Sequence, residues 1–424
     1  MQERVVHTLE NGFKVVHIPF ENIESATFRL FGRAGSLWET DDSLGAAHFL
    51  EHVVFEGTKK YPDPDKLKRV VLDVGGSTNA YTSFNQVSFV AKTLKSDMEN
   101  AFDLLSQLVI DPLINQKEVS KHKKIITQEL NRRLDNPLNK FMLNSEKIIF
   151  PKGHRRQKPI LGTFESIDKT TSSMLKNYLK NNYTANNFVL GVCADVPTKM
   201  VTTFAEKYFS EMKKGKQNDF KIITDTNELE VYCEKNKNII QSTVIINFFA
   251  PIQYEKESYP SEYLSTIMGK GFISRINTEI REKRGLAYVT GANYSDANDF
   301  GMFNMYAQID EKNFSKVMAI FKKEIKKVVE KGITKEEFER TRKQIMANFV
   351  FSNERPKKRA GINTGLILDG KDKEDYDSLL QKYKNVTIED VNSIAHKIFK
   401  KKPKIKVLSK NIQKEIVIDI WNQH

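Results

Sequence analysis

The sequence contains few cysteines and no long apolar segment. Cys193 and Cys233 are far apart and form no CxxC pattern, which argues against a disulfide framework and fits a reducing compartment. No run of 18 apolar residues occurs, so no membrane span is expected. Residues 1–4 do not begin a basic and then apolar leader, and no signal peptide is expected. We therefore expect a cytoplasmic protein, with a periplasmic or organellar location open if a leader was removed.

The length and composition indicate more than one globular domain. A chain of 424 residues is too long for a single core, and a hydrophobic share of 39% supports packed structure. The net charge of +13 is spread over several patches without a zinc knuckle or an RNA-recognition signature. We therefore expect a solvated lysine-rich surface rather than a nucleic-acid partner. The patches are residues 121–124, 155–156, 357–359 and 400–404.

The two halves of the chain follow a similar plan. Apolar periodicity predicts a hairpin over 5–17, helices over 44–55 and 118–134, and strands over 77–81 and 86–93. A comparable order of strands and helices recurs after roughly 215 to 220 residues, which indicates an internal duplication. The second half has no counterpart of the histidines described next.

The stretch His48-Phe49-Leu50-Glu51-His52 lies within the expected helix 44–55. Residues four apart share a helix face, so His48 and His52 can bind one metal ion, with Glu51 beside them. A carboxylate next to such a metal can take a proton from bound water, and the inverted order occurs in zinc peptidases. The alternative is an amphipathic helix that carries two histidines.

A third ligand is expected because catalytic zinc commonly takes three protein ligands. Glu129 lies on the long helix 118–134, and Ile125, Ile126 and Leu130 make one side of that helix apolar. A glutamate that adjoins a buried side is uncommon unless it is paired or binds metal. The alternative is a surface glutamate in a charged helix.

At this point the chain resembles the pitrilysin, insulin-degrading-enzyme and mitochondrial-processing-peptidase superfamily of inverzincin peptidases. The family motif is His-x-x-Glu-His followed by a glutamate ligand, and Glu129 stands at the matching separation from His52. The resemblance covers nearly the whole chain and is closest to the short bacterial-type members with two domains. Further matching segments are 35–36, 55–58, 79–82, 161–163, 274–275 and 279–288.

The resemblance implies a role for each matching residue. His48, His52 and Glu129 would hold one zinc ion per chain, and Glu51 would act as general base on the zinc-bound water. The stretch Asn79-Ala80-Tyr81-Thr82 would bind substrate by strand addition. In the second half, Arg281 and Tyr288 would bind substrate carbonyl groups or the oxyanion, the alternative being a surface arginine and a strand tyrosine.

One position departs from the family pattern. The family has a second glutamate seven residues before the glutamate ligand, and His122 occupies that position here. We expect His122 to hydrogen-bond a group around the site or to be solvated, and we do not expect it to bind the metal.

The resemblance also implies an α+β fold with two homologous domains, each a mostly antiparallel sheet covered by helices on one face. We expect a zinc-binding catalytic domain over 1–212, a linker over 213–222 and a degenerate domain over 223–424 that carries the arginine–tyrosine element.

The implied function is a zinc-dependent metalloendopeptidase that hydrolyses peptides or unfolded segments in an enclosed chamber. A homodimer is expected, in which Arg281 and Tyr288 complete the zinc site of the other subunit. A heterodimer with a family paralogue is the alternative assembly. The alternative function is a non-catalytic or peptide-binding subunit of such a heterodimer.

Overall fold

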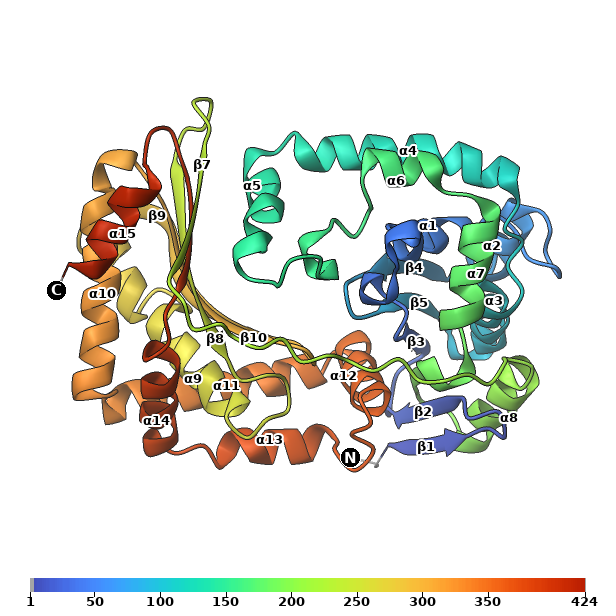
Figure 1. The fold of residues 1–424 in the computed structure, drawn as a ribbon. Helices are drawn as coiled ribbons and strands as arrows, with labels where there is room; N and C mark the ends of the chain where they lie inside the picture. Colours follow the sequence, from blue (N-terminus) through green and yellow to red (C-terminus); the bar gives the residue numbers. More distant parts are fainter. Residues whose placement is uncertain (1–3, 424) are drawn as a thin grey trace. The chain divides into compact units, whose positions relative to one another are not determined.

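The computed structural model describes residues 4–423, which pack into two compact units (Figure 1). The first unit extends to residue 133 and also contains 153–219 and 350–378. The second unit contains 134–152, 220–349 and the remainder of the chain. Each unit therefore includes a short segment from the opposite half of the sequence. No helix within residues 4–423 is long and apolar enough to cross a membrane.

The first unit is built on a six-stranded sheet with the order β1-β2-β6-β3-β5-β4. Strands β2 and β6 pair in parallel, and the other neighbours pair antiparallel. Every residue of β6 is buried, as in a strand that is covered on both faces. The strands are β1 (Val5–Thr8), β2 (Lys14–Pro19), β3 (Ser25–Gly32), β4 (Ser77–Thr82), β5 (Val87–Leu94) and β6 (Phe188–Ala194).

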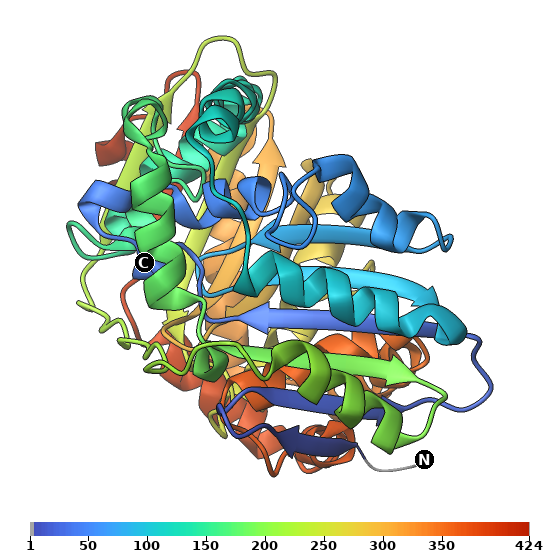
Figure 2. The same cartoon turned by 90° about the vertical axis from the view of Figure 1, so that its right-hand side faces the viewer.

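Helices pack on both faces of this sheet, whereas the resemblance implies helices on one face. Helices α3 (Met98–Ile110) and α8 (Thr198–Phe209) lie across the face turned to the viewer in Figure 2, where Phe28 meets Phe102 edge to face. Helix α12 (Pro356–Leu368) packs on β2, β3 and β6. Because side chains alternate along a strand, Phe31, which contacts α12, points to the face opposite that of Phe28.

The second unit repeats this plan with a five-stranded sheet of order β7-β11-β8-β10-β9. Strands β7 and β11 pair in parallel and the others antiparallel. The order matches β2-β6-β3-β5-β4 of the first sheet, including the position of the parallel pair. The expected two-domain fold with mostly antiparallel sheets is thereby confirmed. The strands are β7 (Glu230–Lys235), β8 (Ser242–Ala250), β9 (Ala287–Asp296), β10 (Gly301–Ile309) and β11 (Lys404–Ser409).

Each half of the sequence contributes one equivalent short helix to the unit formed mainly by the other half. The long helices α4 (Gln116–Leu134) and α11 (Lys335–Asn353) are each followed by a short helix that begins with proline. After α4, helix α5 (Pro137–Ser145) packs in the second unit, where Phe141 contacts the ring of Tyr232. After α11, α12 packs on the first sheet. The domain boundaries expected from the sequence stay a prediction.

Strand β11 corrects one expectation about the lysine-rich surface. Residues 400–404 are expected to be solvated, but Lys404 is 1% exposed and Lys406 is 2% exposed. Both lysines are central in the second sheet and pair with Glu230 and Glu146 at 2.8 and 3.0 Å. Lysines that alternate with apolar residues are typical of a strand with one face in solvent. The sequence therefore does not indicate that this strand is buried.

The remaining helices cover the sheets or connect their strands. In the second unit, Phe248 and Phe303 of the sheet meet Phe399 of α14 edge to face. The helices not yet given are α1 (Ala46–Val53), α2 (Pro64–Leu72), α6 (Phe164–Lys169), α7 (Ser172–Asn182), α9 (Ser258–Gly269), α10 (Phe314–Lys331), α13 (Tyr376–Lys384), α14 (Ile388–Phe399) and α15 (Lys414–Asn422).

Candidate metal centre

Helix α1 carries the two histidines, and a glutamate outside the helix holds its first turn. Gly45, before the helix, has a φ of 88°, and a Cβ there would approach a backbone oxygen of a neighbouring loop to 2.8 Å. Glycine has no side chain to cap the helix. Instead Glu39, which is 5% exposed, accepts hydrogen bonds from the backbone N–H groups of Gly45 at 2.9 Å and Ala47 at 3.0 Å. This carboxyl group therefore stabilises the turn from which His48 projects.

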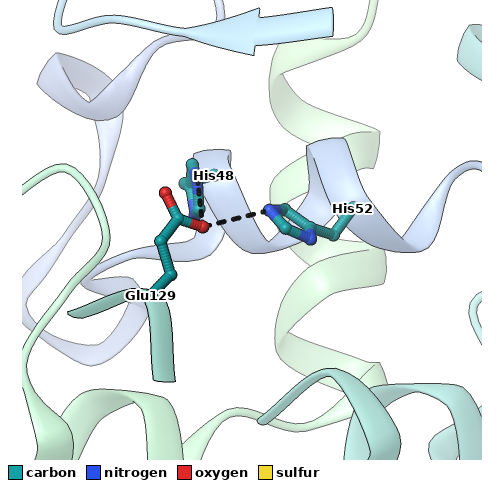
Figure 3. Close-up of side chains that lie close together, drawn as sticks. All are labelled: His48, His52 and Glu129. Atoms are coloured by element: carbon teal, nitrogen blue, oxygen red, sulfur yellow. Dashed lines mark ion pairs between the residues drawn. The ribbon is translucent and has the colours of Figure 1, made fainter. Parts of the chain in front are cut away.

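His48, His52 and Glu129 converge on one point (Figure 3). Nε2 of each histidine lies 3.7 Å from Oε2 of Glu129, and the ligand atoms all lie within 4.8 Å of one another. Within residues 4–423, they form the one group of three or more ligand-type side chains close enough to share a metal ion. The structure thus brings the three expected ligands together, and their binding of zinc stays a prediction.

Both imidazoles are held in the neutral form that binds metals. Burial, together with the neighbouring His52, lowers the pKa of His48 to about 3. Burial, together with His122, lowers the pKa of His52 to about 4. Nδ1 of His48 is buried and has no hydrogen-bond partner among the described residues. The two rings therefore offer unprotonated nitrogen donors to a cation at neutral pH.

Glu51 lies on the same helix but outside the group of three. Its Oε2 accepts a 2.5 Å hydrogen bond from Oγ1 of Thr82. Burial raises the pKa of Glu51 to about 7; the charge of Glu129 acts in the same direction, and the bond from Thr82 acts against it. A carboxyl group with a pKa near neutrality can both accept and return a proton.

Glu129 approaches the histidines from α4, but the apolar side of this helix differs from the one expected. Ile126 and Leu130 are buried, as predicted, but Ile125 is 40% exposed and does not belong to the packed face. The Glu129 side chain is 31% exposed, between that face and solvent. A carboxylate at this border can face the histidines without being fully desolvated.

The expected substrate stretch, residues 79–82, lies on β4 at an edge of the first sheet. Within the described residues β4 pairs with β5 alone, so no strand occupies its other side. Asn79 and Tyr81 are exposed, whereas Ala80 and Thr82 are half-buried. This geometry suits the addition of an extended peptide strand.

Arg281 and Tyr288 lie together in the second unit. Arg281 is in a π-helical turn (Asn277–Glu282), and Tyr288 is on the edge strand β9. The guanidinium carbon of Arg281 lies 4.8 Å from the ring centroid of Tyr288 and 5.3 Å from that of Phe272. Both rings are largely exposed, Tyr288 by 74% and Phe272 by 69%. Such π-helical turns occur frequently at functional sites, and a guanidinium between two rings can donate hydrogen bonds from its edge.

His122 is buried, so the solvated alternative does not hold. It is 6% exposed, and its ring centroid lies 5.6 Å from that of His52, with the planes at 72°. Its Nε2 lies 3.1 Å from Oε1 of Glu56, at ion-pair distance but without the alignment of a hydrogen bond. A supporting role for His122 stays a prediction.

The sequence reasoning misses Glu39, Glu56 and Phe272, which the structure places beside the expected site residues. A weak signal exists for each one. Glu39 is followed six residues later by Gly45, Glu56 belongs to a segment that matches the resemblance, and Phe272 follows a glycine-rich break. None of these signals indicates which residue the side chain contacts, because the contact partners are set by folding.

Two models of one peptidase family match the chain. Residues 14–159 match the model described as insulinase, peptidase family M16. Residues 169–345 match the model described as the peptidase M16 inactive domain. The first match contains the histidines, Glu51 and Glu129, and the second contains Arg281 and Tyr288. Together the two matches span most of the chain.

Similar proteins are known as proteases. A Rickettsia felis protein named as an uncharacterized zinc protease is 27% identical over 402 residues, which cover 93% of this chain and 94% of that protein. The beta subunit of the mitochondrial-processing peptidase of Saccharomyces cerevisiae is 26% identical over 361 residues, 81% of this chain and 77% of that subunit.

The fold also matches a solved structure. A protease from Helicobacter pylori superposes with a TM-score of 0.85 at 21% identity, over 96% of this chain and 99% of that one. At this level of identity the match shows the fold.

Proposed function

The chain belongs to the insulinase family of peptidases, family M16, and on that premise we propose that it is a zinc-dependent metalloendopeptidase acting on peptides or unfolded segments. The observation that carries the proposal is the convergence of both histidine Nε2 atoms on one oxygen of Glu129, at 3.7 Å each. Glu51, a carboxyl group poised near neutrality, lies on the same helix.

The three side chains suit a zinc ion. Two neutral imidazoles and a carboxylate form a common donor set for catalytic zinc, and donors about 2.1 Å from a tetrahedral ion lie roughly 3.4 Å apart. The 3.7 Å distances to Glu129 are close to this value. When bound, zinc would act as a Lewis acid that lowers the pKa of water and polarises the scissile carbonyl group.

Glu51 performs the proton transfers in this proposal. Its carboxylate takes a proton from the attacking water and returns it to the leaving amine. Thr82 donates its hydroxyl hydrogen to Oε2 of Glu51 and so sets the direction in which the carboxylate faces.

The edge strand β4 binds the substrate backbone. A peptide that adds to β4 forms main-chain hydrogen bonds, which supply affinity with little demand on side chains. Because Thr82 ends the strand beside Glu51, a peptide in this register passes the catalytic carboxylate. An extended, unfolded segment can bind in this way, whereas a folded domain cannot.

We propose further that two chains associate and enclose the substrate in a chamber. Arg281 and Tyr288 of one chain then donate hydrogen bonds to the substrate at the zinc site of the other chain. The relationship to a peptidase subunit named beta supports an assembly of this kind. A homodimer has two such sites, whereas a heterodimer with a family paralogue can have one.

The second candidate function is a non-catalytic or peptide-binding subunit. The match of residues 169–345 to an inactive domain favours it. The convergence of His48, His52 and Glu129 favours the enzyme, because a subunit that only binds peptides does not need a metal site.

The test is mass spectrometry of a peptide library incubated with the zinc-loaded protein, the chelated protein and the Glu51→Gln variant. We expect internal cleavage by the first sample alone, with full zinc content in Glu51→Gln. Equal product formation by Glu51→Gln would contradict the mechanism. Stoichiometric zinc without cleavage of any peptide would favour the binding subunit.

A further inference from the structure

A buried acid–imidazole pair lies beside the histidine ligands and has no part in the mechanism above. Glu56 follows the C-terminal end of α1, and His122 is on α4, so the pair joins the two helices that carry the ligands. Both side chains are 7% exposed, and Nε2 of His122 lies 3.1 Å from Oε1 of Glu56. Buried polar groups that are paired with one another make the structure around them more rigid.

The Glu56 carboxylate is ionised and held from its other side. Nζ of Lys121 lies 2.8 Å from Oε2 of Glu56, which leaves Oε1 for His122. Burial alone would raise the pKa of Glu56, but contacts with Lys121, His122 and Glu118 lower it to about 2. A fixed negative charge therefore stands behind the His122 ring.

The His122 ring, positioned by Glu56, contacts the ring of the ligand His52. The two rings meet edge to face, with centroids 5.6 Å apart and planes at 72°. This contact limits rotation of the His52 ring about its own axis, and the carboxylate limits movement of the His122 ring. Groups outside the ligand set commonly orient metal-binding histidines, usually through a hydrogen bond, and here the contact is between two rings.

We propose that Glu56 is a positioning residue that acts through His122 to hold the His52 imidazole for metal binding. The resemblance predicts a glutamate at position 122, on α4. Here an imidazole takes that position, and Glu56 supplies the carboxylate from the α1 side. The proposal rests on the metal site of the proposed function.

The experiment measures zinc affinity by competition with a chromophoric chelator, and the visible spectrum of the Co²⁺-substituted protein. Glu56→Gln is expected to weaken zinc binding roughly 10–100-fold and to alter the Co²⁺ spectrum. The matched control is Glu165→Gln, because Glu165 pairs with Lys169 at 2.6 Å and both side chains are largely exposed. The control is expected to bind zinc within about twofold of wild type, the range of a neutral surface change.

An interchange variant separates positioning from folding. Glu56→His combined with His122→Glu restores a carboxylate–imidazole pair in reverse order, and it is expected to recover most of the zinc affinity that either single change loses. Thermal unfolding of each apo-protein checks the fold. The proposal is overturned if Glu56→Gln binds zinc as tightly as Glu165→Gln, or if the interchange binds no better than the single variants. Wild-type protein that binds no zinc would instead overturn the proposed function.

Discussion

Oγ1 of Thr82 donates a 2.5 Å hydrogen bond to Oε2 of Glu51, which joins the end of edge strand β4 to helix α1. One residue thus connects the strand proposed to bind the substrate with the carboxylate proposed to move the proton. Because β4 also pairs with β5, the position of Glu51 is tied to the sheet as well as to its own helix.

We expect Thr82→Val to lower kcat for peptide cleavage by about tenfold or more, with a smaller change in KM, since it removes the bond that orients Glu51. Thr82→Ser keeps the hydroxyl group and should retain most of the activity. Steady-state kinetics with a fluorogenic peptide measure both. A valine variant with wild-type kcat would show that this hydrogen bond does not matter for turnover.

Zinc should stabilise the folded chain. A ligand at 100 times its Kd that binds only the native state adds about 2.7 kcal/mol to the free energy of unfolding. The Tm of wild-type protein is therefore expected to rise with zinc and to fall after chelation, whereas His52→Ala should show neither change. His7→Ala is the matched control, since His7 lies at the surface and pairs with Glu206. A zinc-dependent Tm in His52→Ala would exclude the proposed ligand set.

Glu39 should make stability depend on pH. Burial raises the pKa of Glu39 to about 8, with Gly45 and Ala47 acting in the opposite direction. A raised pKa means that the folded state prefers the protonated acid, so this contribution is complete below about pH 4.5 and is lost as the pH rises through 8. The loss is up to about 1.4 kcal/mol for each pH unit in that window. Urea unfolding of wild type and Glu39→Gln from pH 5 to 9 measures it, and the variant should show the flatter profile.

Mixing two inactive variants tests whether subunits share a site. Glu51→Gln lacks the base, and Arg281→Ala lacks the oxyanion group, so each alone should be inactive. If Arg281 acts on the partner's zinc site, random re-association should restore about a quarter of the sites, one in each mixed dimer. Co-expressed, differently tagged chains provide the mixed dimer for assay. If each chain completes its own site, the mixture contains no intact site and stays inactive.

The buried pair on β11 should matter for stability. Glu146→Gln leaves the buried Lys406 without its countercharge, which should lower the free energy of unfolding by roughly 3 kcal/mol. Glu165→Gln, which breaks the exposed pair with Lys169, should leave it nearly unchanged. Urea titrations compare the two. Replacing Lys406 by Met in the Glu146→Gln background should recover stability if the uncompensated charge is the cause.

Local pattern was sufficient for much of the fold. Helix α4 and strand β5 begin and end within two residues of the predicted ranges 118–134 and 86–93, because each has a clear apolar pattern. Helices α5 and α12 were not anticipated, since each follows a long helix after a short break and packs beside residues distant in sequence. The residues of such a helix do not indicate which of the two sheets it packs on.

The sequence by itself determined the candidate ligands: the spacing of His48 and His52 puts them on one helix face, and the separation to Glu129 matches a known family. The tertiary structure alone decided what surrounds them. Glu39 holds the first turn of α1, and Glu56 faces His122, because buried polar groups need hydrogen-bond or ion-pair partners. Ligand spacing is a local property that a sequence records directly. The contacts that orient those ligands depend on how separate helices pack, and only the folded chain specifies that packing.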